Sequence, residues 1–192
     1  MDRREALKAS SLILGYTLTA GTAAALLQGC KAETKSDWTP KTLSQEQVDL
    51  LAEICEAILP KTDTPGAKDA LCHRYIDEML TNFYAKEDQE YYIKSLEVFN
   101  TKSMAKYSKA FIALNPGERE EILGVLAAEA KDYKDESGKK PHIFSKIKEA
   151  TISGYFTSEA GAKGGLCAFL PVPGPYQGCI DYSTIGKGYV IS

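Results

Sequence analysis

The spacing of apolar side chains is the feature that most limits how this chain can fold. Between residues 43 and 158, apolar residues return at every third or fourth position, which is the period of an amphipathic helix. We find no convincing run of alternating apolar and polar residues that would predict strands. The pattern therefore predicts an all-α fold, a small bundle of about five helices over residues 43–158.

The first helix has the clearest start. Ser44 is a preferred N-cap residue, and Gln47 stands three positions later, which is the capping-box arrangement. The prolines and glycine of "LPKTDTPG" end this helix. The residues expected on its inner face are Val48, Leu51, Ile54, Cys55 and Ile58.

Four further helical stretches follow along the chain. They are predicted at residues 67–83, at residues 88–114 as one helix or two broken near Asn100, at residues 115–130, and at residues 141–156. Asn115 as N-cap, Pro116 and Glu118 open the fourth of the five. Leu71, Phe83 and Met104 are among the residues expected to face inward.

The N-terminus has the form of an export signal. Arg3 and Arg4 stand side by side, residues 9–27 carry no charge, and "LQGC" ends at Cys30. A basic region, an apolar region and small residues before a cleavage site predict a signal peptide over residues 1–29. The paired arginines resemble a twin-arginine signal, whose pathway exports folded proteins, although a Sec signal can also carry two arginines.

The segment "LQGC" resembles the lipobox of bacterial lipoproteins, in which the cysteine receives the lipid. Lipid on Cys30 would place the protein on the periplasmic side of the envelope, held to the membrane through the polar tether of residues 30–42. The alternative is an uncleaved membrane anchor, which the glycines and hydroxyl residues of the apolar stretch disfavour.

Charge and cysteine content set further limits. The net charge is −3, and basic residues are interleaved with acidic ones, so nothing indicates a nucleic-acid partner. Four cysteines follow Cys30, and they allow three disulfide pairings among which the sequence does not choose. Cys167 and Cys179 would close a short loop in the C-terminal segment, whereas Cys55 and Cys72 are either paired or small core residues.

Residues 159–192 differ from the rest of the chain. They are rich in glycine and proline and show no helical period, so we expect a long irregular tail. Disorder is one interpretation, but the segment carries more apolar side chains than a solvated tail needs. We therefore predict a partner-binding surface there, carried by Phe169, Pro171, Pro173, Pro175 and Tyr176.

Candidate catalytic residues are scarce. The two histidines, His73 and His142, fall on different predicted helices, and no metal-binding, haem-binding or dinucleotide motif is present. The adjacent acids Asp77-Glu78 and Glu120-Glu121 are expected on solvent-exposed helix faces. These observations argue against an enzyme and against a cofactor held by this chain.

Three segments resemble a known family. "LLAEICEAILPKTDTPGA", "ATISGYFTSEAGA" and "PVPGPYQGC" are similar to segments of the gluconate 2-dehydrogenase subunit 3 family. The resemblance implies a small accessory subunit that accompanies a flavoprotein of the glucose–methanol–choline oxidoreductase family, often with a c-type cytochrome. FAD would lie in the flavoprotein and haem c in the cytochrome. The twin-arginine signal would then export the folded flavoprotein as a passenger.

Two other functions remain open from the residues alone. A free-standing helical lipoprotein that serves as a binding or scaffold module of the envelope is the main alternative. An independent hydrolase is a further alternative, which the lack of an acid–base pair disfavours.

Overall fold

The computed structural model describes residues 38–134 and 140–164 continuously, and then residues 167–169, 172, 174–175, 178–181, 183, 186 and 188–190. The chain divides into one unit that ends at Thr39 and a second unit that begins at Pro40 and contains the helices that the structure describes. Arg3, Arg4 and Cys30 lie outside the described residues. Export and lipidation therefore stay predictions.

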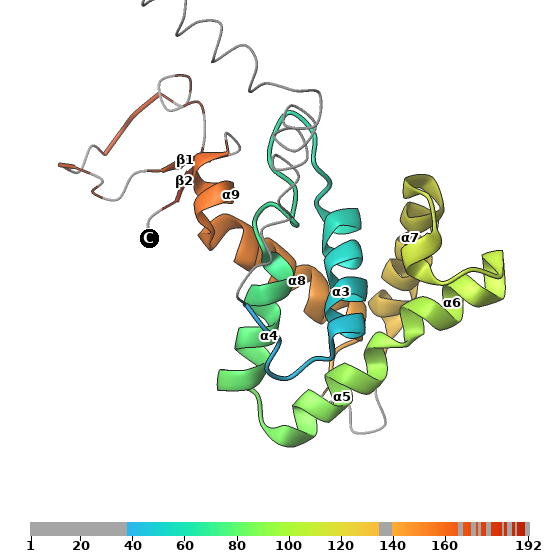
Figure 1. Cartoon of the computed structure of the whole chain (residues 1–192). Coiled ribbons are helices and arrows are strands. Elements are labelled where there is room, and N and C mark those ends of the chain that lie inside the picture. The colour runs from blue at the N-terminus through green and yellow to red at the C-terminus, as the bar shows by residue number, and fades with distance from the viewer. Residues whose placement is uncertain are drawn as a thin grey trace, which may run out of the picture. The chain divides into compact units, whose positions relative to one another are not determined.

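The second unit is helical, which confirms the predicted fold class (Figure 1). Its helices are α3 (Gln45–Ile58), α4 (Cys72–Phe83), α5 (Lys86–Leu96), α6 (Val98–Tyr107), the 3₁₀ turn η1 (Phe111–Ala113), α7 (Pro116–Asp132), α8 (Ile143–Thr157) and α9 (Glu159–Lys163). Two very short strands, β1 (Ala168–Phe169) and β2 (Tyr189–Val190), pair in parallel. Within the described part of the chain, no helix is both long and apolar enough to cross a bilayer.

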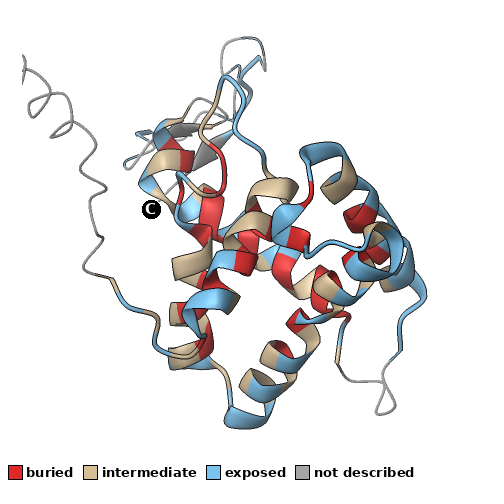
Figure 2. Cartoon of the chain, turned by 45° about the vertical axis from the view of Figure 1, so that its right-hand side comes forward, coloured by how far each residue is buried: buried red, intermediate tan, exposed pale blue. Residues whose placement is uncertain are grey.

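Helices α3 and α8 form the centre of the bundle. α3 packs against α4, α5, α7, α8 and η1, and α8 packs against α4, α5, α7 and α9. Figure 2 shows the buried residues on the helix faces that are turned toward one another. The buried faces of the two central helices include Val48, Leu51, Ile54 and Cys55 on α3 and Ile143, Phe144, Ile147, Thr151 and Tyr155 on α8.

The predicted capping box of α3 is present, and a second one opens α7 at the predicted N-cap Asn115. The Ser44 hydroxyl accepts a hydrogen bond from the Gln47 backbone nitrogen at 3.3 Å, and the Gln47 side chain accepts one from the Ser44 nitrogen at 2.9 Å. Asn115 and Glu118 make the same reciprocal pair at the start of α7, with both distances 2.9 Å. The caps fix where α3 and α7 begin, because they satisfy backbone donors that the helix leaves free.

The second predicted helix begins later than expected. Residues 67–71 form a turn, and α4 begins at Cys72, because Leu71 adopts the left-handed conformation with φ of 55°. That conformation interrupts a right-handed helix and leaves Leu71 exposed. The inward placement predicted for Leu71 is therefore wrong.

Phe83 and Met104 are also exposed, so their predicted inward placement is wrong. Phe83 is the last residue of α4, and the apolar stripe of that helix is buried only as far as Leu80. The buried residues of α6 are Phe99 and Ser103, and Met104 points about 100° away from Ser103. Periodicity finds the apolar side of a helix but does not show where its neighbours stop.

The stretch predicted as one or two helices forms α5, α6 and η1. The break falls at Glu97 instead of near Asn100. The Asn100 side chain instead accepts a hydrogen bond from the Phe111 nitrogen at 3.1 Å and so holds η1 against α6. The rings of Phe99 and Phe111 meet edge to face beneath this contact, 5.8 Å apart.

The helical body extends past Ser158, where the irregular tail was predicted to begin. Ser158 caps α9 by accepting a hydrogen bond from the Gly161 nitrogen at 3.0 Å. Gly161 and Ala162 are buried, and a Cβ on Gly161 would lie 1.9 Å from the Tyr155 carbonyl oxygen. The prediction that no helix follows Ser158 is therefore wrong for Glu159–Lys163, and the β1–β2 pair adds a short ladder within the tail.

Asp77 is fully buried, which overturns its predicted place on a solvent-exposed face. Its carboxylate accepts hydrogen bonds from three successive backbone nitrogens, those of Lys41 at 2.8 Å, Thr42 at 3.1 Å and Leu43 at 2.9 Å. Burial of the carboxylate is tolerated because these donors replace water. The contact fastens the segment before α3 to α4.

Candidate functional site

The chain between α3 and α4 forms a tight loop around the carboxylate of Glu56. Glu56 accepts hydrogen bonds from the backbone nitrogens of Lys61 at 2.9 Å and Lys68 at 2.8 Å. A Cβ on Gly66 would lie 2.4 Å from a Glu56 carboxylate oxygen and 2.7 Å from the Lys61 nitrogen. Only glycine lets the backbone come this close to Glu56.

The same loop is fastened to α8 and closed on itself. The Tyr155 hydroxyl on α8 donates a hydrogen bond of 2.8 Å to the Pro65 carbonyl oxygen, and the Ala67 nitrogen donates one of 2.9 Å to the Leu59 carbonyl oxygen. Gly164, just after α9, approaches Pro65 so closely that a Cβ there would lie 2.6 Å from the proline ring. The loop is therefore a rigid part of the fold.

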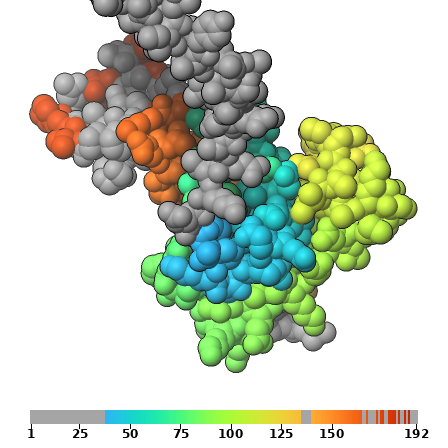
Figure 3. Space-filling model, in the orientation of Figure 1, coloured from blue at the N-terminus to red at the C-terminus, as the bar shows by residue number. Residues whose placement is uncertain are grey.

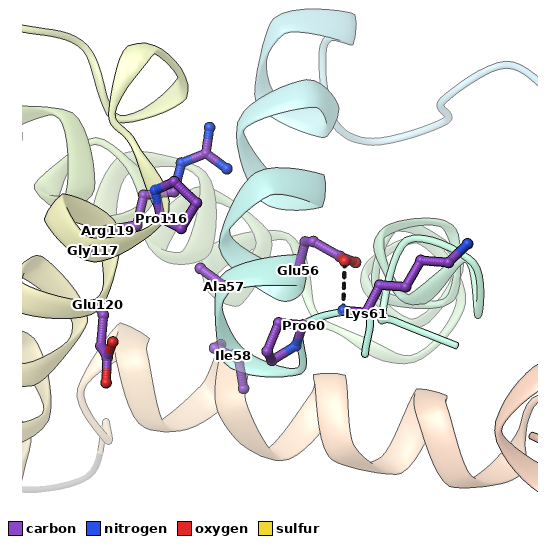
Figure 4. A pocket seen from close by; sticks show the side chains of 9 residues that line it. All are labelled: Glu56, Ala57, Ile58, Pro60, Lys61, Pro116, Gly117, Arg119 and Glu120. Carbon is purple, nitrogen blue, oxygen red and sulfur yellow. Dashed lines mark hydrogen bonds between the residues drawn. The ribbon is translucent and has the colours of Figure 1, made fainter. Parts of the chain in front are cut away.

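Beside this loop, a groove of about 630 Å³ separates the end of α3 from the start of α7. In the space-filling view it lies where the cyan surface of α3 meets the yellow surface of α7 (Figure 3). Figure 4 shows its lining, which comprises apolar Ala57, Ile58, Pro60, Pro116 and Gly117 and charged Glu56, Lys61, Arg119 and Glu120. The volume lies in the range of about 300–1,000 Å³ that is usual for binding sites.

Three of the four charges at the groove have partners within the chain. Arg119 donates to Glu53 at 2.5 Å and to the Ile112 carbonyl oxygen at 2.7 Å, while Lys61 pairs with Asp69 at 3.0 Å. Glu56 is held by the loop nitrogens. Glu120 is exposed and has no hydrogen-bond or ion-pair partner among the described residues.

Glu53 lies behind the groove and fixes Arg119. Burial raises the pKa of Glu53, but the hydrogen bond from Lys68 and the charges of Arg119 and Lys68 outweigh burial, and the pKa is lowered. Glu53 is therefore ionised at neutral pH. The ion pair holds the first turn of α7 against α3.

The two histidines lie at separate places, His73 on α4 and His142 at the start of α8. His142 caps α8, where its Nδ1 accepts a hydrogen bond from the Phe144 nitrogen at 3.2 Å, and burial lowers its pKa. Burial lowers the pKa of His73, on α4, to about 4. Both imidazoles are therefore neutral at pH 7, and within the described ranges no group of three or more metal-ligating side chains gathers.

Cys55 and Cys72 are buried free thiols, which confirms their interpretation as core residues. They contact Thr151, whose hydroxyl donates to the Cys55 sulfur at 3.3 Å and whose carbonyl oxygen accepts from Cys72 at 3.5 Å. Burial raises the pKa of Cys55 to about 12 and that of Cys72 to about 11. Neither thiol is a nucleophile at neutral pH, because the thiolate is the reactive form.

The predicted interface in the tail is described only in part. Phe169 lies in β1, Pro175 is exposed, and Pro171, Pro173 and Tyr176 fall outside the described residues. Val172 is 76% exposed and Ile180 is also exposed. Cys167 is half-buried and Cys179 is exposed, and the disulfide between them stays a prediction.

Comparison with known protein families gives a match over residues 45–174, from the start of α3 into the tail, to the gluconate 2-dehydrogenase subunit 3 family. The chain belongs to this family. The predicted resemblance is thereby confirmed, and the family is that of an accessory subunit of a dehydrogenase complex. No curated protein and no solved structure gives a significant match.

Sequence reasoning missed the groove. Its walls come from two segments far apart in the chain, the end of α3 and the start of α7. Each segment carries a recognisable signal, namely "LPKTDTPG" after α3 and "NPGE" before α7. Nothing in either signal indicates that the two prolines Pro60 and Pro116 line one groove, because that depends on how α3 packs against α7.

Proposed function

We propose that this chain is the non-catalytic small subunit of a periplasmic, membrane-tethered, FAD-dependent dehydrogenase, and that it assists the export, assembly and anchoring of the flavoprotein. Membership of the gluconate 2-dehydrogenase subunit 3 family over residues 45–174 is the observation that carries the proposal. The flavoprotein, of the glucose–methanol–choline type, would hold FAD and oxidise a sugar, a sugar acid or a glycoside. A c-type cytochrome would accept the electrons.

The surface of the described residues supports a binding role. Val172 and Ile180 present apolar side chains to solvent in the tail, and the groove between α3 and α7 presents a preformed apolar floor. A preformed apolar groove on a small protein is typical of surfaces that bind another molecule.

Arg3 and Arg4 supply the export part of the proposal. A flavoprotein that binds FAD in the cytoplasm has to cross the membrane folded, and the twin-arginine pathway carries folded proteins. The small subunit would bind the flavoprotein first and then carry it across as a passenger. Replacing Arg3 and Arg4 with lysine should then leave both proteins in the cytoplasm, whereas unchanged export of either one contradicts the passenger route.

Affinity purification of the tagged full-length protein from its native membranes tests the proposal. Mass spectrometry of the eluate should identify a flavoprotein without a signal peptide of its own, and the visible spectrum should show bound flavin. If the eluate contains the small subunit without a flavoprotein, the result would support the alternative, a free-standing scaffold lipoprotein.

A further inference from the structure

The groove between α3 and α7 has walls that are already ordered. On one side, the Leu59 nitrogen donates to the Cys55 carbonyl oxygen at 2.9 Å and closes the end of α3. On the other side, the capping box of Asn115 and Glu118 fixes the first turn of α7. A ligand that enters this groove therefore does not have to order it, which lowers the entropy cost of binding.

The floor of the groove suits an extended chain with small or aliphatic side chains. Pro60 and Pro116 contribute ring surfaces that lack backbone N–H donors, and Ala57 and Ile58 lie beside them. A Cβ on Gly117 would meet only the Asn115 side-chain oxygen within 4 Å, at 3.5 Å, so a backbone could approach this wall closely. Such a floor offers apolar contact and few convergent hydrogen-bond donors, unlike a site for a small polar molecule.

The charges at the rim decide which charge the occupant carries. Lys61, Arg119 and Glu56 are engaged by Asp69, Glu53 and the loop nitrogens, so they are already compensated within the chain. Glu120 alone among the four rim charges has no described partner. Charge complementarity therefore favours a cation opposite Glu120.

We propose that this groove binds an extended segment of the complex's catalytic subunit, in which an aliphatic or proline residue packs on Pro60 and Pro116 and a nearby lysine or arginine pairs with Glu120. The inference rests on the proposed function and goes beyond it by naming a second contact surface, separate from the tail, and its chemistry. Binding at two sites on one partner would strengthen the complex, because the second contact forms within the complex made by the first.

Two pairs of matched variants of the full-length protein test the proposal. Glu120→Lys reverses the rim charge, and Glu149→Lys makes the same change at another exposed helical glutamate that has no described partner. Ala57→Trp fills the groove, and Ala127→Trp places the same ring in a smaller groove between α7 and α8. The purified variants are titrated against the purified flavoprotein after circular dichroism has confirmed their helix content.

Glu120→Lys and Ala57→Trp should each raise the dissociation constant about ten-fold or more, as truncations at interface hot spots do, and the two controls should change it less than about two-fold. The Glu120→Lys effect should shrink as salt is raised. If the flavoprotein binds the wild type and the groove variants equally, the groove proposal is wrong while the proposed function stands. If the wild type binds no flavoprotein, the proposed function itself fails.

A photo-crosslinking benzoyl-phenylalanine at position 57 identifies the occupant directly. The crosslinked peptide should come from the flavoprotein and carry a lysine or arginine close to an aliphatic or proline residue. A crosslink to an acidic segment, to the tail of this chain, or to a second copy of this chain would overturn the proposal. So would native mass spectrometry that finds a small molecule retained by the wild type and lost from Ala57→Trp.

Discussion

The hydroxyl of Tyr155 on α8 lies 2.8 Å from the carbonyl oxygen of Pro65, and this hydrogen bond joins the loop after α3 to a residue ninety positions later. Tyr155 is buried, so Tyr155→Phe leaves the Pro65 carbonyl oxygen without this partner. We expect the free energy of unfolding to fall by about 1–2 kcal/mol, measured by urea titration. Tyr107→Phe is the control, because the Tyr107 hydroxyl bonds to Glu121 on the exposed surface, and its loss should cost less than about 0.5 kcal/mol.

Gly66→Ala and Gly124→Ala should change stability in opposite directions. A Cβ at position 66 would lie 2.7 Å from the Lys61 backbone nitrogen, whereas a Cβ at position 124 meets nothing within 4 Å. Gly66→Ala should destabilise the protein by about 1–3 kcal/mol because it overpacks a fixed loop. Gly124→Ala, inside α7, should stabilise it by about 0.5–1 kcal/mol because alanine loses less entropy in a helix. If both variants change stability equally, the loop around Glu56 can shift to accommodate a Cβ at position 66.

Stability should fall as the pH is lowered from 7 to 5. The pKa of His73 is about 4 in the folded protein, where burial lowers it, against about 6.5 in the unfolded chain. Between these two values the unfolded chain binds more protons, so acid favours unfolding. Burial lowers the pKa of His142 as well and acts in the same direction.

The variant His73→Gln should reduce this pH dependence, and the double variant with His142→Gln should reduce it further. Urea titrations at pH 7, 6 and 5 measure the effect. If His73→Gln keeps the full wild-type dependence of the unfolding free energy on pH, protonation of His73 does not destabilise the fold.

The tail can be tested apart from the helical body. A shortened chain should end at Gly164, because α9 is packed on α8 and ending the chain at Ser158 would remove buried Gly161 and Ala162. The shortened chain should keep its helical circular dichroism and lose the flavoprotein in co-purification. In the full chain, Phe169→Ala and Tyr176→Ala should each weaken binding by about 2 kcal/mol if they anchor the interface. Full-strength binding by the shortened chain would exclude the tail as an interface.

Cys30→Ala should release the protein from membranes without changing its fold. The folded body begins after the tether, and Cys30 lies outside the described residues. Intact mass of the wild type should include the lipid, and the variant should appear in the soluble fraction or keep its uncleaved signal. Unchanged membrane partition together with an unlipidated wild-type mass would contradict the lipoprotein assignment.

The sequence predicted the starts of α3 and α7 because the signals are local. Ser44 with Gln47 and Asn115 with Glu118 act across three residues, and both pairs form as expected. The start of α4 was misplaced because the left-handed turn at Leu71 depends on how the loop closes around Glu56 and on contacts from α8 and α9.

The burial of Asp77 could not be predicted from its own neighbourhood. In the sequence, Asp77 is one of two adjacent acids on a helix. Its hydrogen-bond partners are backbone nitrogens more than thirty positions earlier in the chain. Backbone donors carry no signature in the sequence, so a carboxylate that depends on them resembles a solvent-exposed acid. The groove residues Glu120 and Ala57 were missed for a related reason, since each acquires its role only when α3 and α7 pack together.

The contact of Asp77 with Lys41, Thr42 and Leu43 also has a mechanical consequence. A pull on the chain from its N-terminal side reaches these three hydrogen bonds before it reaches the capping box of α3. The force is therefore transmitted to α4 through the buried Asp77 carboxylate, together with the side-chain contacts of Lys41 with Glu78 and of Thr42 with Thr81, before the first turn of α3 is strained. If the protein is tethered to the membrane through its N-terminus, the contacts of Asp77 would carry the pulling force and protect helix α3 from it.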